Sequence, residues 1–381
     1  MEQNRHILHM DMDTFFVSVE RLRDNQLIGK PLIIGGASDR GVVASCSYET
    51  RKYGVHSAMP IKLARRLCPD AIIIRPDMDA YSKKSQDVTE IIKENAPVVE
   101  KASIDEHYLD LTGMDKFFGC LKWSHELRER IIKETGLPIS LGLSVNKTVS
   151  KIATGEAKPS GELQVNPMEV KPFLFPLPVR KIPGVGEKSA ELLRGLGILK
   201  IKTMAETSLS LIKRTLGENG ISIWKKANGI DNAPVVPYSE AKSISTEQTF
   251  EQDTTDKKFL SLLIKQMVEE LAFKLRQQEK LTSCVTVKIK YSDFDTHTAQ
   301  KRIPYTSFDH TLYEVAHELL YKLYQRRVLV RLVGVKLSGL VPGVQQINMF
   351  EDSMELVNLY QAIDKMKNRF GEDSITRGYR I

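Results

Sequence analysis

Residues 6–16 read HILHMDMDTFF, an apolar run that ends in two aspartates and two phenylalanines. Its start, from His6 to Met10, predicts a short strand that delivers the Asp11 carboxylate at its carboxyl end. An aspartate in this place is also an ordinary turn or helix-cap residue. The stretch therefore indicates chemistry only if partners for Asp11 exist elsewhere in the chain.

Such partners occur in residues 103–110, SIDEHYLD, where Asp105 and Glu106 are adjacent within a strand pattern. Because side chains alternate on a regular strand, two adjacent carboxylates converge only at a hairpin tip or a bulge. A solvated polar turn is the alternative. Residues 98–111 therefore predict two strands around an acidic tip.

Three carboxylates on neighbouring strands repel one another unless cations lie between them, and hard oxygen ligands suit Mg²⁺. A nucleoside triphosphate would complete the coordination. One ion would then activate a 3′-hydroxyl while the other neutralises the leaving pyrophosphate. We therefore expect a catalytic site of Asp11, Asp105 and Glu106 that holds two Mg²⁺ ions.

The triphosphate also needs cationic partners from the protein. No GxxxxGK and no GxGxxG motif occurs, so side chains rather than a glycine-rich loop must bind the phosphates. Each candidate taken alone is also an ordinary solvated surface residue. The candidates lie in residues 45–55 and in or after a predicted helix at 144–157: Tyr48, Arg51, Lys52, Lys147, Lys151 and Lys158.

Length and composition limit the class of protein. A chain of 381 residues predicts two to four domains, and 41% hydrophobic with 27% charged residues is typical of globular proteins. The four cysteines are far apart without a CxxC pair, which argues against a zinc site or a disulfide framework. No apolar run is long enough for a membrane span and no signal peptide is evident, so we expect a cytoplasmic protein without a membrane partner.

Charge is unevenly distributed along the chain. Residues 1–168 hold 23 basic and 23 acidic residues, whereas residues 169–342 hold 27 and 19. A neutral first part joined to a basic second part favours a catalytic unit followed by a region that grips a polyanion. A basic surface without a partner is the alternative.

The order of predicted elements indicates an α+β multidomain protein. Helices are expected at 79–95 and 121–135, and strands and helices alternate without a regular βαβ rhythm. The stretch 231–242, with two prolines and little periodicity, predicts a linker. The order β-α-β-β-α-β over 243–342 is typical of a ferredoxin-like domain, and 355–369 predicts a terminal helix.

Two regions of the basic part indicate DNA contacts. Residues 182–190, IPGVGEKSA, place Gly184 and Gly186 in a tight turn that opens a helix, where backbone amides can approach a phosphate. An ordinary helical hairpin is the alternative, but the flanking Arg180, Lys181 and Lys188 favour a sequence-independent DNA backbone contact. Lys288 and Lys290 are alternate residues of a predicted strand and so share one face.

Together these segments resemble the Y-family of translesion DNA polymerases, and within it the bacterial DNA polymerase IV type. The resemblance covers essentially the whole chain, and the order and separation of its motifs match. The motifs are DMDTFF at 11–16, YETRKYGV at 48–55, SIDE at 103–106, AKPSG at 157–161 and IPGVG at 182–186.

The resemblance implies roles for individual residues in a low-fidelity enzyme without a proofreading exonuclease. Asp11, Asp105 and Glu106 would hold the metals with help from the Met12 carbonyl. Phe16 would be the steric gate that excludes the ribose 2′-hydroxyl. The nucleotide-binding residues would be Phe15, Phe16, Tyr48, Arg51 and Lys158. Thr14 and His107 depart from the commonest family residues, which leaves the packing around them open.

The resemblance also implies a right-hand polymerase with small fingers, a helix-hairpin-helix thumb and a little finger. Its partners would be primer-template DNA and deoxynucleoside triphosphates, bound by a monomer. The implied domains are a palm at 1–17 and 78–168, fingers at 18–77, a thumb at 169–236, a linker at 237–242, a little finger at 243–342 and a tail at 343–381.

The tail contains QINMF at 346–350, which resembles the sliding-clamp motif of bacterial polymerases. Gln346, Met349 and Phe350 would bind the clamp, with Met349 where leucine is commoner. Packing of Met349 and Phe350 on the little finger is the alternative.

Two other functions remain to be weighed. The catalytic subunit of polymerase V is the alternative within the enzyme class, although it is usually longer. A non-catalytic DNA-binding adaptor with the same fold is the alternative outside that class.

Overall fold

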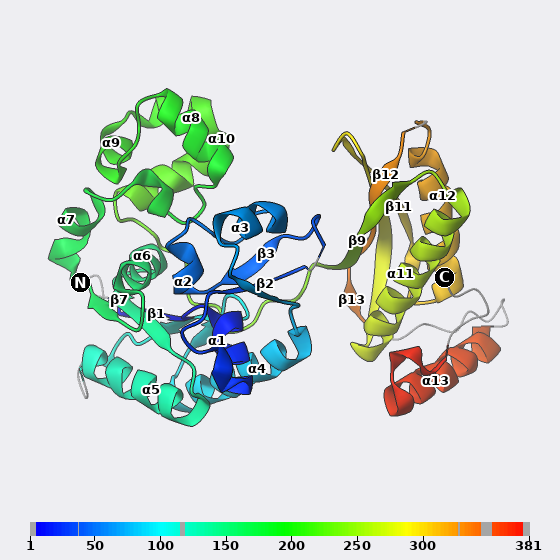
Figure 1. Cartoon of the computed structure of the whole chain (residues 1–381), viewed down its shortest axis with the longest axis horizontal. Coiled ribbons are helices and arrows are strands. Elements are labelled where there is room, and N and C mark those ends of the chain that lie inside the picture. The colour runs from blue at the N-terminus through cyan, green and yellow to red at the C-terminus, as the bar shows by residue number, and fades with distance from the viewer. Residues whose placement is uncertain (1–4, 37, 115–118, 327, 344–352, 376–381) are drawn as a thin grey trace. The chain divides into compact units, whose positions relative to one another are not determined.

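The computed structural model of the chain describes residues 5–36, 38–114, 119–326, 328–343 and 353–375. The chain divides into two compact units, Met1–Ser239 and Glu240–Ile381 (Figure 1). Each unit has its own hydrophobic core.

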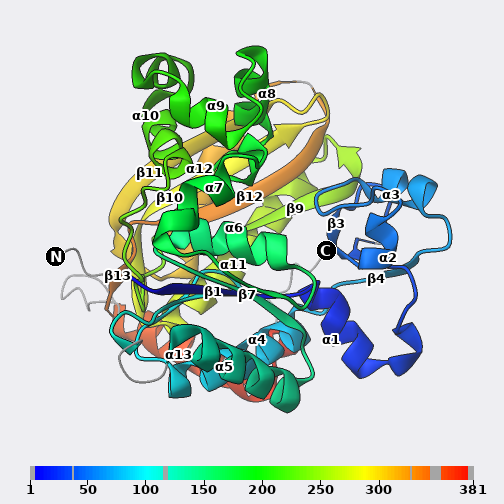
Figure 2. The ribbon, with the colours of Figure 1, turned by 90° about the vertical axis from the view of Figure 1, so that its left-hand side faces the viewer.

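The main sheet of the first unit has five strands in the order β5-β6-β1-β7-β8, with β1 in the middle. Strand β1 is antiparallel to both of its neighbours. Helices cover both faces of this sheet, with α4 and α5 on one side and α6 on the other (Figure 2). The elements are β1 (Ile7–Met12), α4 (Met78–Asn95), β5 (Val99–Lys101), β6 (Glu106–Asp110), α5 (Cys120–Thr135), β7 (Ile139–Ser144), α6 (Lys147–Ala157) and β8 (Glu162–Gln164).

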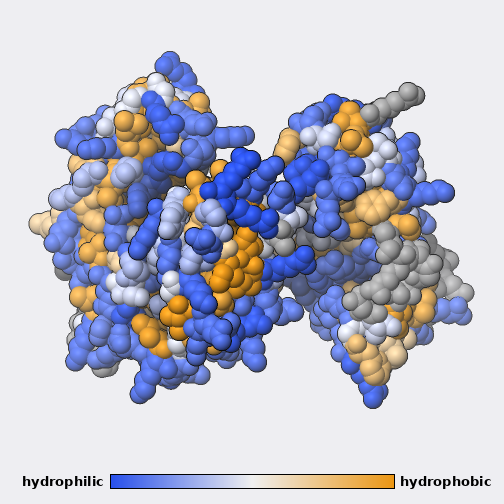
Figure 3. All heavy atoms as spheres, viewed as in Figure 1, coloured by the Kyte–Doolittle hydropathy of each residue, from blue (hydrophilic) through white to orange (hydrophobic). Residues whose placement is uncertain are grey.

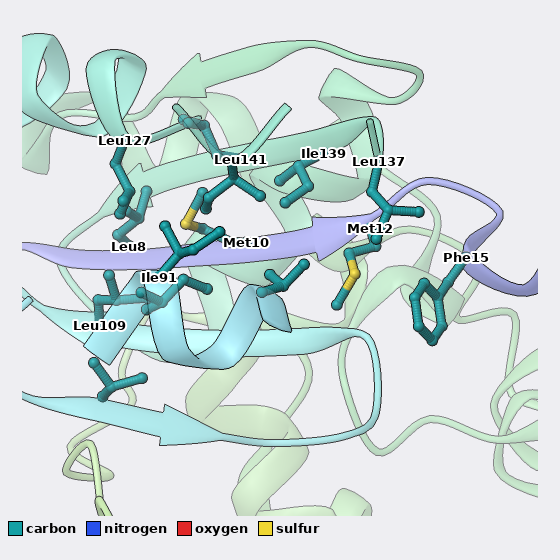
Figure 4. Close-up of a cluster of buried hydrophobic side chains, with 14 of the residues drawn as sticks. Leu8, Met10, Met12, Phe15, Ile91, Leu109, Leu127, Leu137, Ile139 and Leu141 are labelled. Atoms are coloured by element: carbon teal, nitrogen blue, oxygen red, sulfur yellow. The ribbon is translucent and has the colours of Figure 1, made fainter. Parts of the chain in front are cut away.

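Alternation along β1 decides which residues enter the core and which reach the opposite face. Leu8, Met10 and Met12 are buried among the side chains of α4, α5 and β7 (Figure 4). Because side chains alternate on a strand, His9 and Asp11 lie on the face that α6 covers. The apolar strand thus anchors Asp11 through its even-numbered residues.

The strands and helices predicted around the acidic residues are confirmed, with one correction. Strands β5 and β6 form the antiparallel pair expected within 98–111, with a tip that contains Asp105. The helix predicted at 144–157 starts later, because Ser144 ends β7 and Asn146 caps α6 by accepting a hydrogen bond from the Val149 amide.

A three-stranded sheet of order β3-β2-β4 forms a second small core in this unit. The apolar residues Leu32–Gly35 form strand β2 of this sheet rather than a strand of the main one. The elements are α1 (Phe15–Arg23), β2 (Leu32–Gly35), β3 (Val43–Cys46), α2 (Tyr48–Arg51), α3 (Ile61–Leu67) and β4 (Ile72–Ile74).

The segment from Val170 to Ala227 is mainly helical. The longest helix contains a non-helical residue, Gly217, with φ of 66°. The helices are α7 (Val170–Leu174), α8 (Glu187–Gly195), α9 (Ile201–Glu206) and α10 (Leu209–Ala227).

Part of the stretch predicted as a linker is fixed to the main sheet and α6. Asp231 accepts hydrogen bonds from the backbone and hydroxyl of Thr148, at 3.1 and 2.7 Å. The Val236 amide donates to Glu100 at 2.6 Å, and Val235 is buried against Ile7. Periodicity could not reveal this docking, because single side chains rather than a repeating face make the contacts.

The second unit confirms the predicted β-α-β-β-α-β order. Its sheet runs β11-β10-β12-β9, so that β12 lies between β9 and β10. This is a split arrangement, and α11 and α12 pack against one face of the sheet (Figure 1). The elements are β9 (Ser243–Thr254), α11 (Lys257–Gln277), β10 (Lys280–Tyr291), β11 (Thr296–Thr306), α12 (Asp309–Leu323), β12 (Val330–Ser338) and β13 (Val341–Pro342).

The terminal helix predicted at 355–369 is confirmed as α13 (Ser353–Phe370), and it docks on the second unit. Tyr360 is buried and stacks on Phe308 at 5.4 Å. Asp364 accepts hydrogen bonds at 2.7 and 3.0 Å from Arg276, which also pairs with Asp309 at 2.6 Å. An aromatic stack and a charged network are therefore among the contacts that hold the helix.

The four cysteines form no disulfide with one another, and all except Cys284 are buried. The face seen in Figure 3 is mainly hydrophilic, with hydrophobic residues in smaller groups. In the part of the chain that the structure describes, no helix has the length and apolar character needed to cross a membrane.

Candidate active site

The predicted carboxylates meet at one end of β1 and β6. Asp11 lies directly opposite Glu106 in the strand pairing. Asp105 lies at the β5–β6 tip, where its carbonyl accepts a 3.0 Å hydrogen bond from the Met12 amide and its carboxylate accepts one from Ser103 at 2.6 Å. The irregular tip expected from two adjacent acids therefore joins both of them to the end of β1.

Two lysines partly neutralise this cluster. Lys158 pairs with Asp11, and Lys151 pairs with Glu106 at 2.6 and 2.5 Å. Lys151 projects from α6, and Lys158 directly follows that helix. Lys147, also proposed as a phosphate ligand, instead pairs with Glu100 at 2.6 Å.

The electrostatics of the two paired carboxylates differ. Burial raises the pKa of Asp11 to about 7, and the charges of Glu106 and Asp105 add to the rise, against the opposing effect of Lys158. Burial also works to raise the pKa of Glu106. The paired Lys151 ammonium and the nearby His9 ring outweigh burial there and hold the Glu106 pKa below its ordinary value. The site thus carries an excess of negative charge that favours cations.

His9, which the sequence did not single out, lies behind Glu106. Its ring is buried, and Nδ1 is 2.8 Å from the Thr154 hydroxyl. Nε2 lies 4.0 Å from Glu106 and has no hydrogen-bond partner among the described residues. Burial lowers the pKa of His9.

Asp13 is the other residue that sequence reasoning missed. Its carboxylate is buried and accepts hydrogen bonds from the Ser140 hydroxyl at 2.9 Å and the Ser160 amide at 2.6 Å. These bonds connect the end of β1 to the segment that carries Lys158. Asp13 lies in the turn directly after β1, and its Asp-x-Asp spacing from Asp11 could have indicated this role.

Tyr48 and Arg51 lie together on α2. The Arg51 guanidinium is 5.0 Å from the centre of the Tyr48 ring. The buried Tyr48 hydroxyl has no hydrogen-bond partner in the described part of the chain. Burial, reinforced by the charge of Asp13, raises the Tyr48 pKa to about 12, so this hydroxyl remains a neutral donor near the carboxylates.

The two phenylalanines that follow β1 have different environments. Phe15 is buried in the main core, as Figure 4 shows. Phe16 is partly buried and stacks on Tyr81 with ring centres 4.4 Å apart. Of the two rings, Phe16 is the one with a surface left for a ligand.

The two residues that depart from the family pattern have packing roles. Thr14 has φ of 43° and caps α1, so it turns the chain from β1 into the helix. His107 is buried, and its Nε2 lies 2.9 Å from the Thr89 hydroxyl on α4. His107 therefore points away from Glu106, its neighbour on the strand.

The glycine turn before α8 is open. Gly184 has φ of 102°, and a Cβ added at Gly184 or Gly186 would meet nothing within 4 Å. Lys188 is exposed. The two preceding cations are already paired, Arg180 with Glu187 and Lys181 with Glu156. Lys188 and the backbone amides are thus better placed for an anion than Arg180 or Lys181.

Lys288 and Lys290 lie on the sheet face opposite α11 and α12, as their spacing predicted. Lys288 pairs with Glu247 at 2.9 Å. Lys290 instead lies over the ring of Phe294, at 4.7 Å from its centre. The predicted clamp residues Gln346, Met349 and Phe350 lie outside the described residues.

Among the described residues, one set of three potential metal ligands lies within 4.8 Å of one another: His125, Glu129 and Glu162. Asp11, Asp105 and Glu106 are not that close together. The exposed set is already occupied by Arg128, which pairs with Glu129 at 2.6 Å and Glu162 at 3.3 Å. It therefore does not compete with the β1 site as a metal centre.

Comparison with protein-family models gives three matches along the chain. Residues 10–155 match the impB/mucB/samB family, and residues 241–349 match the C-terminal domain of that family. Residues 167–198 match its HHH motif, in the segment that includes the Gly184 turn.

Curated relatives span nearly the whole chain. The DNA polymerase IV of Dehalococcoides mccartyi is 37% identical over 99% of this chain and 98% of its own length. That of Methanoculleus marisnigri is 39% identical over 89% of this chain and 96% of its own length. That of Listeria monocytogenes is 37% identical over 90% of this chain and 97% of its own length.

Solved structures share the architecture. A Y-family DNA polymerase chimera of Dbh and Dpo4 superimposes with a TM-score of 0.81 at 29% identity, over 89% of this chain and all of the chimera. An insertion ternary complex of Dbh DNA polymerase gives a TM-score of 0.64 at 28% identity over the same shares.

Proposed function

The chain belongs to the impB/mucB/samB family and is a Y-family translesion DNA polymerase, and we propose that its nucleotidyl transfer takes place at Asp11, Asp105 and Glu106. It binds primer-template DNA and deoxynucleoside triphosphates. The observation that supports the site most strongly is the meeting of the three acids at one strand end with two lysines between them.

Y-family polymerases use divalent metal ions, and we propose two Mg²⁺ ions here. Carboxylate oxygens are the ligands that Mg²⁺ prefers, and this site gathers three carboxylates beside two lysines. Asp11, Asp105, Glu106 and the Met12 carbonyl would hold the ions. When bound, Mg²⁺ lowers the pKa of the primer 3′-hydroxyl and neutralises the leaving pyrophosphate.

The residues around the carboxylates then bind and orient the nucleotide. Tyr48 can donate its unpaired hydroxyl to a phosphate oxygen, and Arg51 and Lys158 supply positive charge. Lys158 would exchange its bond to Asp11 for a phosphate contact. Phe16, braced by Tyr81, would lie against the deoxyribose C2′, while Phe15 supports the site from the core.

We assign the regions of the chain as a right hand. The palm comprises 1–17 and 78–168, the fingers 18–77 and the thumb 169–236. A linker at 237–242 leads to the little finger at 243–342. The match of relatives named DNA polymerase IV to nearly the whole chain favours this type over the polymerase V subunit, and the three intact carboxylates weigh against a non-catalytic adaptor.

We propose that DNA is held by the thumb and the little finger without reading sequence. The thumb contact uses the Gly184 and Gly186 amides with Lys188, and the little-finger contact uses Lys288 and Lys290. The excess of basic residues in 169–342 supports this assignment. The sliding clamp would be bound by Gln346, Met349 and Phe350, and the enzyme would act as a monomer.

Primer extension tests the function directly. The purified chain should add nucleotides opposite an abasic site with Mg²⁺, stop when the ion is chelated, and resume when Mg²⁺ is restored. A chain that binds the same DNA but adds no nucleotide under any metal condition would be the adaptor instead.

A further inference from the structure

The hairpin between β10 and β11 has an unusual residue at its tip. The Phe294 amide donates a 3.0 Å hydrogen bond to the Tyr291 carbonyl and closes the turn. Phe294 has φ of +68°, a left-handed conformation that hairpins of this kind normally give to glycine. Its side chain is 59% exposed. Neither backbone preference nor burial explains a phenylalanine here, and strain of this kind is common at functional sites.

Two cations rest on the Phe294 ring. Lys290 Nζ and the Arg331 guanidinium each lie 4.7 Å from its centre. Arg331 is the extra residue of a bulge in β12, because Lys290 pairs with Leu332 while Tyr291 pairs with Val330. Bulges often re-aim a side chain, and this one brings Arg331 beside Lys290.

The acids of the hairpin are occupied by a different arginine. Arg326 binds Asp293 and Asp295 at once, at 2.8 Å each. Within the described chain, neither Lys290 nor Arg331 has a carboxylate partner. Lys288, two residues along the same strand, is by contrast neutralised by Glu247. The hairpin thus keeps two cations away from its own acids and fixes them on an aromatic ring.

We infer that Phe294 is a positioning residue that holds Lys290 and Arg331 in place for the phosphodiester backbone of DNA. This inference rests on the proposed DNA-binding function of the little finger. Lys and Arg side chains lose rotamer freedom when they bind a phosphate, and the ring restricts that freedom beforehand. An exposed ring in a strained turn contributes little to the fold but organises the charges beside it.

Substitution of Phe294 with glycine distinguishes a role in positioning the two cations from a role in stabilising the fold. Phe294→Gly removes the ring and also relieves the left-handed strain, so thermal stability should stay equal or rise. DNA affinity should fall about fivefold, the scale of losing exposed cation–π contacts. The slope of log affinity against log salt concentration should become shallower, by an amount that corresponds to the loss of up to about two phosphate contacts. A variant that loses stability, or that binds DNA like the wild type, overturns the inference.

Two further measurements make the result specific. Glu279→Gly relieves a positive φ of 50° at the other end of β10, and because it removes a negative charge it should not weaken DNA binding. In a Lys290→Gln, Arg331→Gln background, Phe294→Gly should have no further effect, since Phe294 acts through those cations. A full additional loss in that background would show that the ring contacts DNA itself and would overturn the positioning role. If the wild-type chain binds no DNA, it is the proposed function that fails.

Discussion

Phe16 carries the proposed choice between deoxyribose and ribose. Its ring is held by stacking on Tyr81, whose hydroxyl donates to Glu20 at 2.7 Å, so the gate cannot easily swing aside. Phe16→Ala should therefore admit ribonucleotides, and the ratio of kcat/KM for the two sugars should fall by roughly a hundredfold. Single-nucleotide kinetics with matched dNTP and rNTP measure this ratio.

Phe15→Leu is the matched control for the gate, because Phe15 packs in the core. It should lower stability while leaving sugar selectivity in place. If Phe16→Ala discriminates as well as the wild type, the gate lies elsewhere.

Asp13 shows what one buried carboxylate contributes. Asp13→Asn keeps an acceptor oxygen for the Ser140 hydroxyl and the Ser160 amide but removes the charge that strengthens both hydrogen bonds. Losing charged hydrogen bonds of this kind costs about 2 kcal/mol of unfolding free energy. Because Ser160 is near Lys158 in the chain, KM for the nucleotide should rise as well. Denaturant melts and steady-state kinetics test both effects, and Ser140→Ala should give about half the loss of stability. An Asp13→Asn variant of unchanged stability would refute this account.

At the scale of elements, Lys288 and Lys290 of strand β10 can be compared, because they lie on the same face of the little-finger sheet but have different partners. Lys288 is paired with Glu247, whereas Lys290 lies over the Phe294 ring and has no carboxylate partner among the described residues. Lys290→Ala should therefore weaken duplex binding several-fold and Lys288→Ala less, with the same loss for every template sequence. Titrations on two unrelated duplexes at several salt concentrations measure this. A strong sequence preference, or a larger effect at Lys288, would contradict the proposed contact.

Helix α13 is a second element whose attachment can be tested. Tyr360→Ala removes the buried ring that stacks on Phe308, a change that costs about 3 kcal/mol in a packed site. The helix should then undock, so hydrogen exchange within 353–370 should accelerate while the sheet stays protected. Asp364→Asn should have a smaller effect, because Arg276 keeps its pair with Asp309. Unchanged exchange in Tyr360→Ala would mean that the stack does not hold the helix.

For the molecule as a whole, the sequence was most informative where residue type and spacing carry the signal. Three features were predictable because the periodicity of apolar residues and the residue types of turns are local in the sequence. They are the apolar strand before Asp11, the acidic tip at Asp105 and Glu106, and the β-α-β-β-α-β order. Their meeting at one site followed from the resemblance and from strand geometry. Helical spacing alone could not show that Lys147 pairs with Glu100, so its role as a phosphate ligand stays a prediction.

The features that the sequence did not reveal depend on contacts between distant residues. Asp13 gains its role from its hydrogen bonds to Ser140 and Ser160. The docked part of the predicted linker is held by hydrogen bonds to Glu100 and Thr148. Neither leaves a repeating pattern in the chain. The same holds for the two cations on Phe294, which a bulge in another strand brings together.

The central claim is that the carboxylates at the end of β1 and β6 perform the transfer while other regions hold the DNA. Glu106→Gln and Asp105→Asn should each lower single-nucleotide incorporation with Mg²⁺ by at least about a thousandfold, while the Kd for primer-template DNA changes by no more than about twofold. Asp110→Asn, at the far end of β6, should retain near wild-type incorporation. Near wild-type incorporation by either Glu106→Gln or Asp105→Asn would contradict the site.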